Sequence, residues 1–221
     1  MKTWNPVRIA GLAGLAFAVL TVAGNGSIGS FPDGDSPLAK IVANDTGRHA
    51  DIARGGALLY WAALFFAIFA VALWARVRGS VHPFIAGAVL VGAAVEFAQQ
   101  LAGADTYSTL GFIAGKHTVA PAALQALHIE GAGNDLVTGT GGLALMLLAV
   151  GAAALAGGTL PRWLGWVALP LGLLQLTPLG FFAGAVFWLW AAVAGIVLAV
   201  RPLDAARADT SRRLLGTPGS A

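Results

Sequence analysis

The sequence of 221 residues contains no cysteine and few charged residues. The absence of cysteine excludes disulfide bonds, cysteine-ligated zinc, iron–sulfur clusters and thiol nucleophiles. Charged residues make up 10% of the chain, whereas about a quarter of the residues of a soluble domain are charged. Most of the basic residues lie at the ends of apolar runs, and no DNA- or RNA-binding motif is present, so we expect no nucleic acid partner.

Apolar residues dominate what remains. They make up 57% of the chain, and the mean hydropathy is +0.78. Several runs are long enough to cross a hydrocarbon core of about 30 Å. Because hydrocarbon offers no hydrogen-bond partners, the backbone of such a run pairs with itself as a helix. The sequence therefore predicts an all-α protein, a polytopic helix bundle embedded in the lipid bilayer of the cell (plasma) membrane.

We expect one transmembrane domain, residues 1–203, with six spans. They cover about residues 7–24, 52–75, 83–104, 131–156, 162–178 and 181–200. Residues 25–51 are expected to form an outer loop with a short helix, because Ser36 followed by Pro37 is typical of a helix start. Residues 204–221 are expected to be a flexible cytoplasmic tail. The first span also fits a cleaved signal peptide, and the sequence leaves that alternative open.

The positions of Lys and Arg predict the orientation. With the amino terminus inside, the cytoplasmic side holds nine of them: Lys2, Arg8, Arg76, Arg78, Arg162, Arg201, Arg207, Arg212 and Arg213. The outer side holds four: Lys40, Arg48, Arg54 and Lys116. Cytoplasmic segments of membrane proteins carry an excess of these residues. Both termini are therefore predicted to be cytoplasmic.

Glu96 is an ionisable residue inside an expected span. At about 1.5 Å per helical residue it lies roughly 20 Å from Pro83, in the outer half of the membrane. Gln99 and Gln100 share its helix face. Since a carboxylate is costly in lipid, we expect this face to look at other helices or at water. Glu96 either forms a stabilising bond, with Arg54 as the nearest expected cation, or handles a ligand or proton.

A second polar group precedes the fourth span and contains His128, Asn134 and Asp135. As one long helix, this stretch would place His128 and Asp135 on one face. Alternatively, Gly131 and Gly133 break the helix, and Asn134 or Asp135 caps the next one. Both alternatives place the group near the outer interface, level with Gln99 and Gln100. The sequence thus predicts an outward-facing polar vestibule, whose expected ligand-binding residues are Glu96, Gln99, Gln100, Asn134, Asp135, His128 and Arg54.

No metal or cofactor is expected in this vestibule. Three histidines, His49, His117 and His128, are predicted on the outer side with nearby carboxylates. However, they are scattered over three segments and lack the HxH or HxxxH spacing that places two ligands together.

Three stretches carry a resemblance to a known group. They are SPLAKIVANDTGRHADIARGGALLYWAALFFAIFAVALWARVRG, AALQALHIEGAGNDLVTGTGGLALMLL and LPRWLGWVALPLGLLQLTPLGFF. The chain resembles uncharacterised multi-pass bacterial integral membrane proteins with an LPRWLGW-type loop, a family of unknown function. The resemblance implies a six-span bundle and brings no activity or catalytic residue. In that loop Pro161 starts a helix, Arg162 stays inside, and Trp163 and Trp166 lie at the headgroups.

Three functions fit these observations. In the first, the vestibule binds or passes a small apolar or amphiphilic, lipid-like molecule. In the second, the chain is a non-catalytic accessory or structural subunit, with a homo-oligomer or a membrane complex as its partner. In the third, it is an intramembrane acid-catalysed enzyme of cyclase or isomerase type, with Glu96 or Asp135 as general acid. A cavity reaching Glu96 would favour the first and third, and close packing around Glu96 by Arg54 or Gln100 the second.

Overall fold

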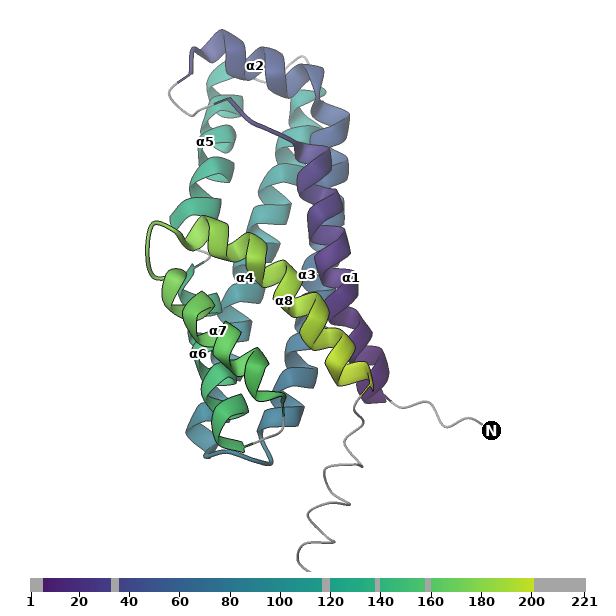
Figure 1. Ribbon diagram of the computed structural model, residues 1–221. Helices are drawn as coiled ribbons and strands as arrows, with labels where there is room; N and C mark the ends of the chain where they lie inside the picture. Colours follow the sequence, from purple (N-terminus) through teal and green to yellow (C-terminus); the bar gives the residue numbers. More distant parts are fainter. Residues whose placement is uncertain (1–5, 33–35, 117–119, 138–139, 158–159, 201–221) are drawn as a thin grey trace, which may run out of the picture.

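The computed structural model describes residues 6–32, 36–116, 120–137, 140–157 and 160–200 (Figure 1). Within these ranges the chain forms eight α-helices and no strand, which confirms the predicted all-α class. The helices are α1 (Pro6–Ile28), α2 (Leu38–Gly47), α3 (His49–Val77), α4 (Pro83–Ala114), α5 (Pro121–Val137), α6 (Thr140–Gly157), α7 (Arg162–Leu174) and α8 (Gly180–Val200). His117 and the predicted tail, residues 204–221, lie outside the described residues.

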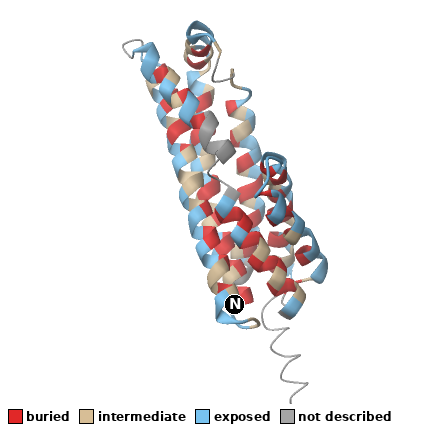
Figure 2. Cartoon of the chain, turned by 90° about the vertical axis from the view of Figure 1, so that its left-hand side faces the viewer, coloured by how far each residue is buried: buried red, intermediate tan, exposed pale blue. Residues whose placement is uncertain are grey.

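Four of these helices are long and apolar enough to cross a membrane. They are α1 over Ile9–Ile28, α3, α4 and α8. The helices α6 and α7 are apolar but shorter. Large apolar side chains are exposed along the outer faces of the bundle, among them Leu12, Val91, Leu173 and Leu189 (Figure 2). Water would disfavour so much exposed apolar surface, and lipid would not. The chain is therefore a helical membrane protein.

The long helices α1, α3 and α4 run side by side, and α5 and α6 follow one another beside α4 (Figure 1). The helices α7 and α8 cover the half of the bundle where α1 begins, with α8 packed on α1 and α7 on α6. The short helix α2 lies across the other end, here called the α2 end. The start of α1 and the end of α8 meet at the opposite end.

Small residues allow these helices to approach closely. A β-carbon added to Gly11 would lie 2.7 Å from the carbonyl oxygen of Gly195, which joins α1 to α8. Between α4 and α6, a β-carbon at Gly92 would lie 2.7 Å from the carbonyl oxygen of Gly142. Since lipid supplies no hydrophobic drive for helix association, such backbone contacts hold membrane bundles together.

An aromatic cluster fills the interior where α1, α3 and α8 meet. The ring centroid of Phe17 lies 5.3 Å from that of Phe66 and 5.8 Å from that of Phe187. Trp190 stacks on Phe187 at 6.0 Å and donates a hydrogen bond of 3.2 Å to the carbonyl of Leu164. These rings form one wall of the region in which the candidate site lies.

The helix α4 extends further than expected. Residues 105–114, predicted as loop, continue the helix to Ala114. Gly111 explains part of this extension, because it packs so tightly on α3 that an added β-carbon would lie 2.7 Å from Cα of Ala53. With 32 residues, α4 is about 48 Å long, more than the roughly 30 Å of hydrocarbon. Its polar residues gather toward the α2 end: Gln99, Gln100, Asp105, Thr106, Tyr107, Ser108 and Thr109.

The helix α5 also differs from expectation. It runs without a break past Gly131 and Gly133, so the fourth expected span is divided between the end of α5 and α6. Gly131 faces Tyr107 of α4, where an added β-carbon would lie 3.3 Å from the ring. Asn134 and Asp135 lie in the last turns of α5 and not ahead of a new helix. Of the two alternatives for this stretch, the one with a helix break at Gly131 and Gly133 and a cap at Asn134 or Asp135 is therefore wrong.

The expected short outer helix is α2. It begins after Pro37, which occupies the N-cap position and contributes no side-chain hydrogen bond. The predicted start at Ser36 is thus displaced by one residue.

Candidate functional site

A cavity of about 330 Å³ lies inside the bundle, between α1, α3, α4 and α8 and beside the start of α6. Its described lining residues are Phe17, Thr21, Asn25, Leu59, Ala62, Glu96, Gln99, Gln100, Gly103, Ala104, Tyr107, Leu143, Gln175, Gly180, Phe181, Gly184, Ala185, Phe187 and Trp188. The cavity lies where α4 changes from an apolar helix to a polar one. It therefore offers both kinds of surface to an occupant.

Glu96 is the buried carboxyl group of this cavity and is 7% exposed. Its Oε1 accepts a hydrogen bond of 2.9 Å from Nε2 of Gln100, one helical turn later. The contact of Gly92 with Gly142 places the first turn of α6 against Glu96, and the backbone amide of Leu143 approaches the carboxyl. A helix amino terminus favours a negative group. Among the described residues, however, Oε2 has no hydrogen-bond partner.

Most other polar groups of the cavity are bonded within the protein. The Thr21 hydroxyl donates a hydrogen bond of 2.8 Å to the carbonyl of Phe17, and Asn25 Nδ2 donates one of 2.9 Å to the carbonyl of Thr21. In the side-chain amide orientation that satisfies both its nitrogen and its oxygen, Gln175 donates a hydrogen bond of 3.2 Å to the Gly180 carbonyl. It also accepts a hydrogen bond of 3.1 Å from the Gly184 backbone amide. Oε1 of Gln99, like Oε2 of Glu96, is buried without a described partner. These two acceptors are the buried polar atoms of the lining that lack a partner among the described residues.

Three of the predicted vestibule residues meet at this cavity: Glu96, Gln99 and Gln100. Arg54 does not line it. Its guanidinium forms an ion pair of 3.1 Å with Asp51, and its side chain is 64% exposed. A partner one turn away on the same helix is easier to reach than Glu96. For Asn134 and Asp135, the latter also a candidate catalytic residue, the side chains lie outside the described part of the structure.

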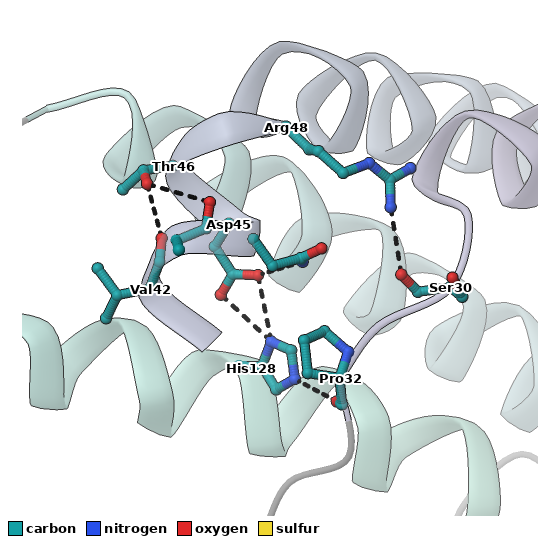
Figure 3. Close-up of polar contacts among 9 residues, drawn as sticks. Ser30, Pro32, Val42, Asp45, Thr46, Arg48 and His128 are labelled. Atoms are coloured by element: carbon teal, nitrogen blue, oxygen red, sulfur yellow. Dashed lines mark hydrogen bonds and ion pairs between the residues drawn. The ribbon is translucent and has the colours of Figure 1, made fainter. Parts of the chain in front are cut away.

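His128 lies at the α2 end in a separate buried cluster (Figure 3). Its Nδ1 is 3.2 Å from Oδ2 and 3.3 Å from Oδ1 of Asp45, and its Nε2 is 2.8 Å from the carbonyl oxygen of Pro32. Both side chains of the pair are fully buried. The Pro32 carbonyl only accepts, so Nε2 is the donor in that hydrogen bond, and Nδ1 faces the carboxyl group of Asp45.

This cluster connects three segments of the chain at the α2 end. Asp45 belongs to α2, His128 to α5, and Pro32 to the segment that follows α1. The Phe31 ring stacks on Tyr107 at 5.7 Å and meets His128 edge-on at 5.0 Å. The guanidinium of Arg48 donates a hydrogen bond of 3.2 Å to the carbonyl of Ser30, just after α1 (Figure 3). It donates a second one of 3.2 Å to the carbonyl of Ser27, in the last turn of α1. The cluster therefore has a structural role.

Several of these residues were not predicted. Asp45 lies in a polar stretch that is typical of an exposed helix. The sequence signal that could have placed Asp45 inside is Ile41, an apolar residue one turn earlier on the same helix face. In the structure both residues are fully buried. Thr21 and Asn25 lie within and just after the first expected span. Their spacing of four residues, on one helix face, is the signal that could have assigned them to the cavity.

Among the described residues, no group of three or more His, Asp and Glu side chains is placed to hold a metal ion. No protein-family model, curated protein or solved structure matches the chain. The class that the fold defines is a helical membrane protein, and the function is inferred from the geometry of the cavity.

Proposed function

We propose that this protein binds or passes a small apolar or amphiphilic molecule through the cavity around Glu96, which faces the outer side of the membrane. The observation that carries the proposal is the Glu96 carboxyl, which is buried beside an open space and has an oxygen without a described partner. An unpaired buried acceptor is destabilising, and ionisable groups within membrane spans commonly mark functional sites. A bound molecule would supply the missing hydrogen bond.

The cavity has the size and lining of a ligand site. Its volume of about 330 Å³ falls at the lower end of the usual range of roughly 300–1,000 Å³ for small-molecule pockets. Aromatic and aliphatic side chains form most of its wall, including Leu59, Phe181 and Trp188. Such a lining favours an apolar ligand, and the polar groups of α4 would orient that ligand in the cavity.

We further propose six crossings of the plasma membrane with both termini cytoplasmic. The 18 residues of α6 extend about 27 Å, close to one membrane thickness. At the end of the bundle where α1 begins, Trp163 and Trp166 are exposed; on α3, about 24 Å along the helix from Val77, Trp61 is exposed. Exposed tryptophans are typical of the two membrane interfaces. In this arrangement the α2 end is outside, and the LPRWLGW-type loop is at the inner headgroups.

The cavity also bears on the alternatives. Of the two contacts expected for an accessory subunit, Gln100 does bond Glu96, whereas Arg54 pairs with Asp51 and not with Glu96. An accessory subunit, however, needs no internal cavity. An enzyme would use the same cavity, with Glu96 as its acid. Binding requires only the contacts described above, and we therefore prefer it.

A bulky side chain inside the cavity tests the proposal. A β-carbon at Gly184 meets no atom within 4 Å, and Gly184 lines the cavity, so Gly184→Trp fills it. Gly87→Trp on α4 is the matched control, because its β-carbon is equally free and it lies outside the lining. Native mass spectrometry of the membrane-extracted protein should show a bound amphiphile in the wild type and in Gly87→Trp, and none in Gly184→Trp. Equal retention in all three proteins would overturn the proposal.

A further inference from the structure

The unpaired polar atoms of the cavity specify the chemistry of its occupant. Oε2 of Glu96 and Oε1 of Gln99 are both buried acceptors without a described partner, while the Thr21 hydroxyl and one hydrogen of each of the Asn25 and Gln100 amides bond within the protein. Acceptors require a donor. An occupant that brought only acceptors would leave both oxygens unpaired and would add its own unpaired groups.

The charges of the lining narrow the choice further. Among the described lining residues, none is Lys or Arg, and Glu96 is the one carboxylic acid. A cationic donor would neutralise that carboxylate and form a charge-assisted hydrogen bond with it. The rings of Phe17, Phe187 and Trp188 also face the cavity, and aromatic faces attract cations. An ammonium group satisfies all three features, whereas a neutral hydroxyl satisfies only the first.

An apolar groove lies next to the cavity, along the outer faces of α1 and α8. It measures about 520 Å³, and its described lining residues are Leu15, Ala18, Val19, Val22, Ala23, Ala185, Trp188, Leu189 and Ala192. Ala185 and Trp188 line both the groove and the cavity. A molecule with its polar end at Glu96 would therefore need to pass these two side chains to lie against the groove. Only hydrocarbon fits a surface without polar side chains that opens toward lipid.

From the lone carboxylic acid of the described lining and the adjacent apolar groove, we propose that the ligand is a membrane-soluble amphiphile with a primary amine head and a hydrocarbon tail. The ammonium group binds Glu96 and Gln99, and the tail lies in the groove between α1 and α8. This inference rests on the proposed function and assigns the ligand class of the same cavity.

Competition between two probes of equal chain length tests the head group. The detergent-solubilised full-length protein is mixed with equal concentrations of hexadecylamine and hexadecanol, and native mass spectrometry counts the bound molecules. We expect the wild type to bind the amine about tenfold more tightly than the alcohol, as one charge-assisted hydrogen bond predicts. Glu96→Gln should remove this preference. Asp105→Asn, which changes an exposed acid on the same helix, should keep it.

Filling the groove tests the tail. Ala23 is exposed and lines the groove but not the cavity, so Ala23→Trp should weaken hexadecylamine binding about tenfold. Ala94→Trp, on an exposed position of α4 away from both spaces, is the control and should bind like the wild type. Unchanged binding in Ala23→Trp would overturn the assignment of the groove.

The outcomes also separate this inference from the proposed function. If amine and alcohol bind equally and Gly184→Trp blocks both, the amine assignment is overturned and the binding function stands. If neither probe binds saturably and no amphiphile is retained from the membrane, both are overturned.

Discussion

Gly142 of α6 lies directly against Glu96 of α4, so that a β-carbon at Gly142 would come within 2.7 Å of the Glu96 backbone nitrogen. Because Gly142 has no side chain, α6 can approach α4 closely enough to enclose Glu96. The same contact brings Leu143 to the carboxyl group and determines where the cavity begins.

Gly142→Ala should therefore separate α4 from α6 at the level of Glu96. The added methyl group would meet backbone atoms of Glu96 and Gly92, which cannot rotate away. We expect a loss of about 1–3 kcal/mol of stability, measured as a lower midpoint of thermal unfolding in detergent. Gly141→Ala is the control, because a β-carbon at that neighbouring glycine has no atom within 4 Å. Equal midpoints for the two variants would contradict the contact.

Asp45→Leu should strongly destabilise the α2 end. The substitution leaves the buried His128 ring without its carboxyl partner, and breaking a buried pair in this way costs about 3–5 kcal/mol. Hydrogen exchange in α2 and α5 should rise, because these two helices are joined by the pair. Asp51→Leu removes an exposed ion pair and should cost less than about 1 kcal/mol. Similar exchange in both variants would show that the pair contributes little.

Gly29→Ala should loosen the connection that follows α1. Gly29 has a φ of +65°, which an L-residue with a side chain adopts at a cost of about 1–2 kcal/mol. The new methyl group would also collide with the Arg48 guanidinium, which bonds the last carbonyls of α1. Limited proteolysis at the α2 end should become faster. Gly47→Ala, where a β-carbon meets no atom within 4 Å, should leave the rate unchanged.

Single cysteines test the proposed orientation, and the natural absence of cysteine makes the wild type a clean background. Lys40→Cys on α2 should react with a membrane-impermeant maleimide in intact cells. Gly79→Cys, between α3 and α4 at the opposite end, should react only after permeabilisation. Both positions are exposed, so a difference in labelling reports the side of the membrane. The reverse pattern would invert the protein and place the cavity on the inner side.

The sequence was sufficient to predict the helical membrane class and the shared face of Glu96, Gln99 and Gln100. Hydropathy and the helical period are local properties, and hydrocarbon leaves the backbone little choice. The outer part of α4 was missed because its polar residues resemble a loop, while a contact with α3 at Gly111 keeps them helical.

Local sequence patterns could not predict contacts between segments that are distant in the chain. His128 and Asp45 are 83 residues apart, and neither position carries a motif that names the other. Arg54 was expected to approach Glu96 because it is the nearest cation along the bundle. Its actual partner, Asp51, is determined by one turn of the same helix, and such a choice between two acids depends on side-chain geometry.

The first and last helices, α1 and α8, both line the cavity, and they touch at Gly11 and Gly195. During synthesis the ribosome makes α1 before any other described helix and α8 after them, so the cavity is completed only when both have emerged. A nascent chain that stopped before α8 would present an open glycine face to lipid or to another protein. The cavity is therefore a property of the assembled bundle and of no shorter piece of it.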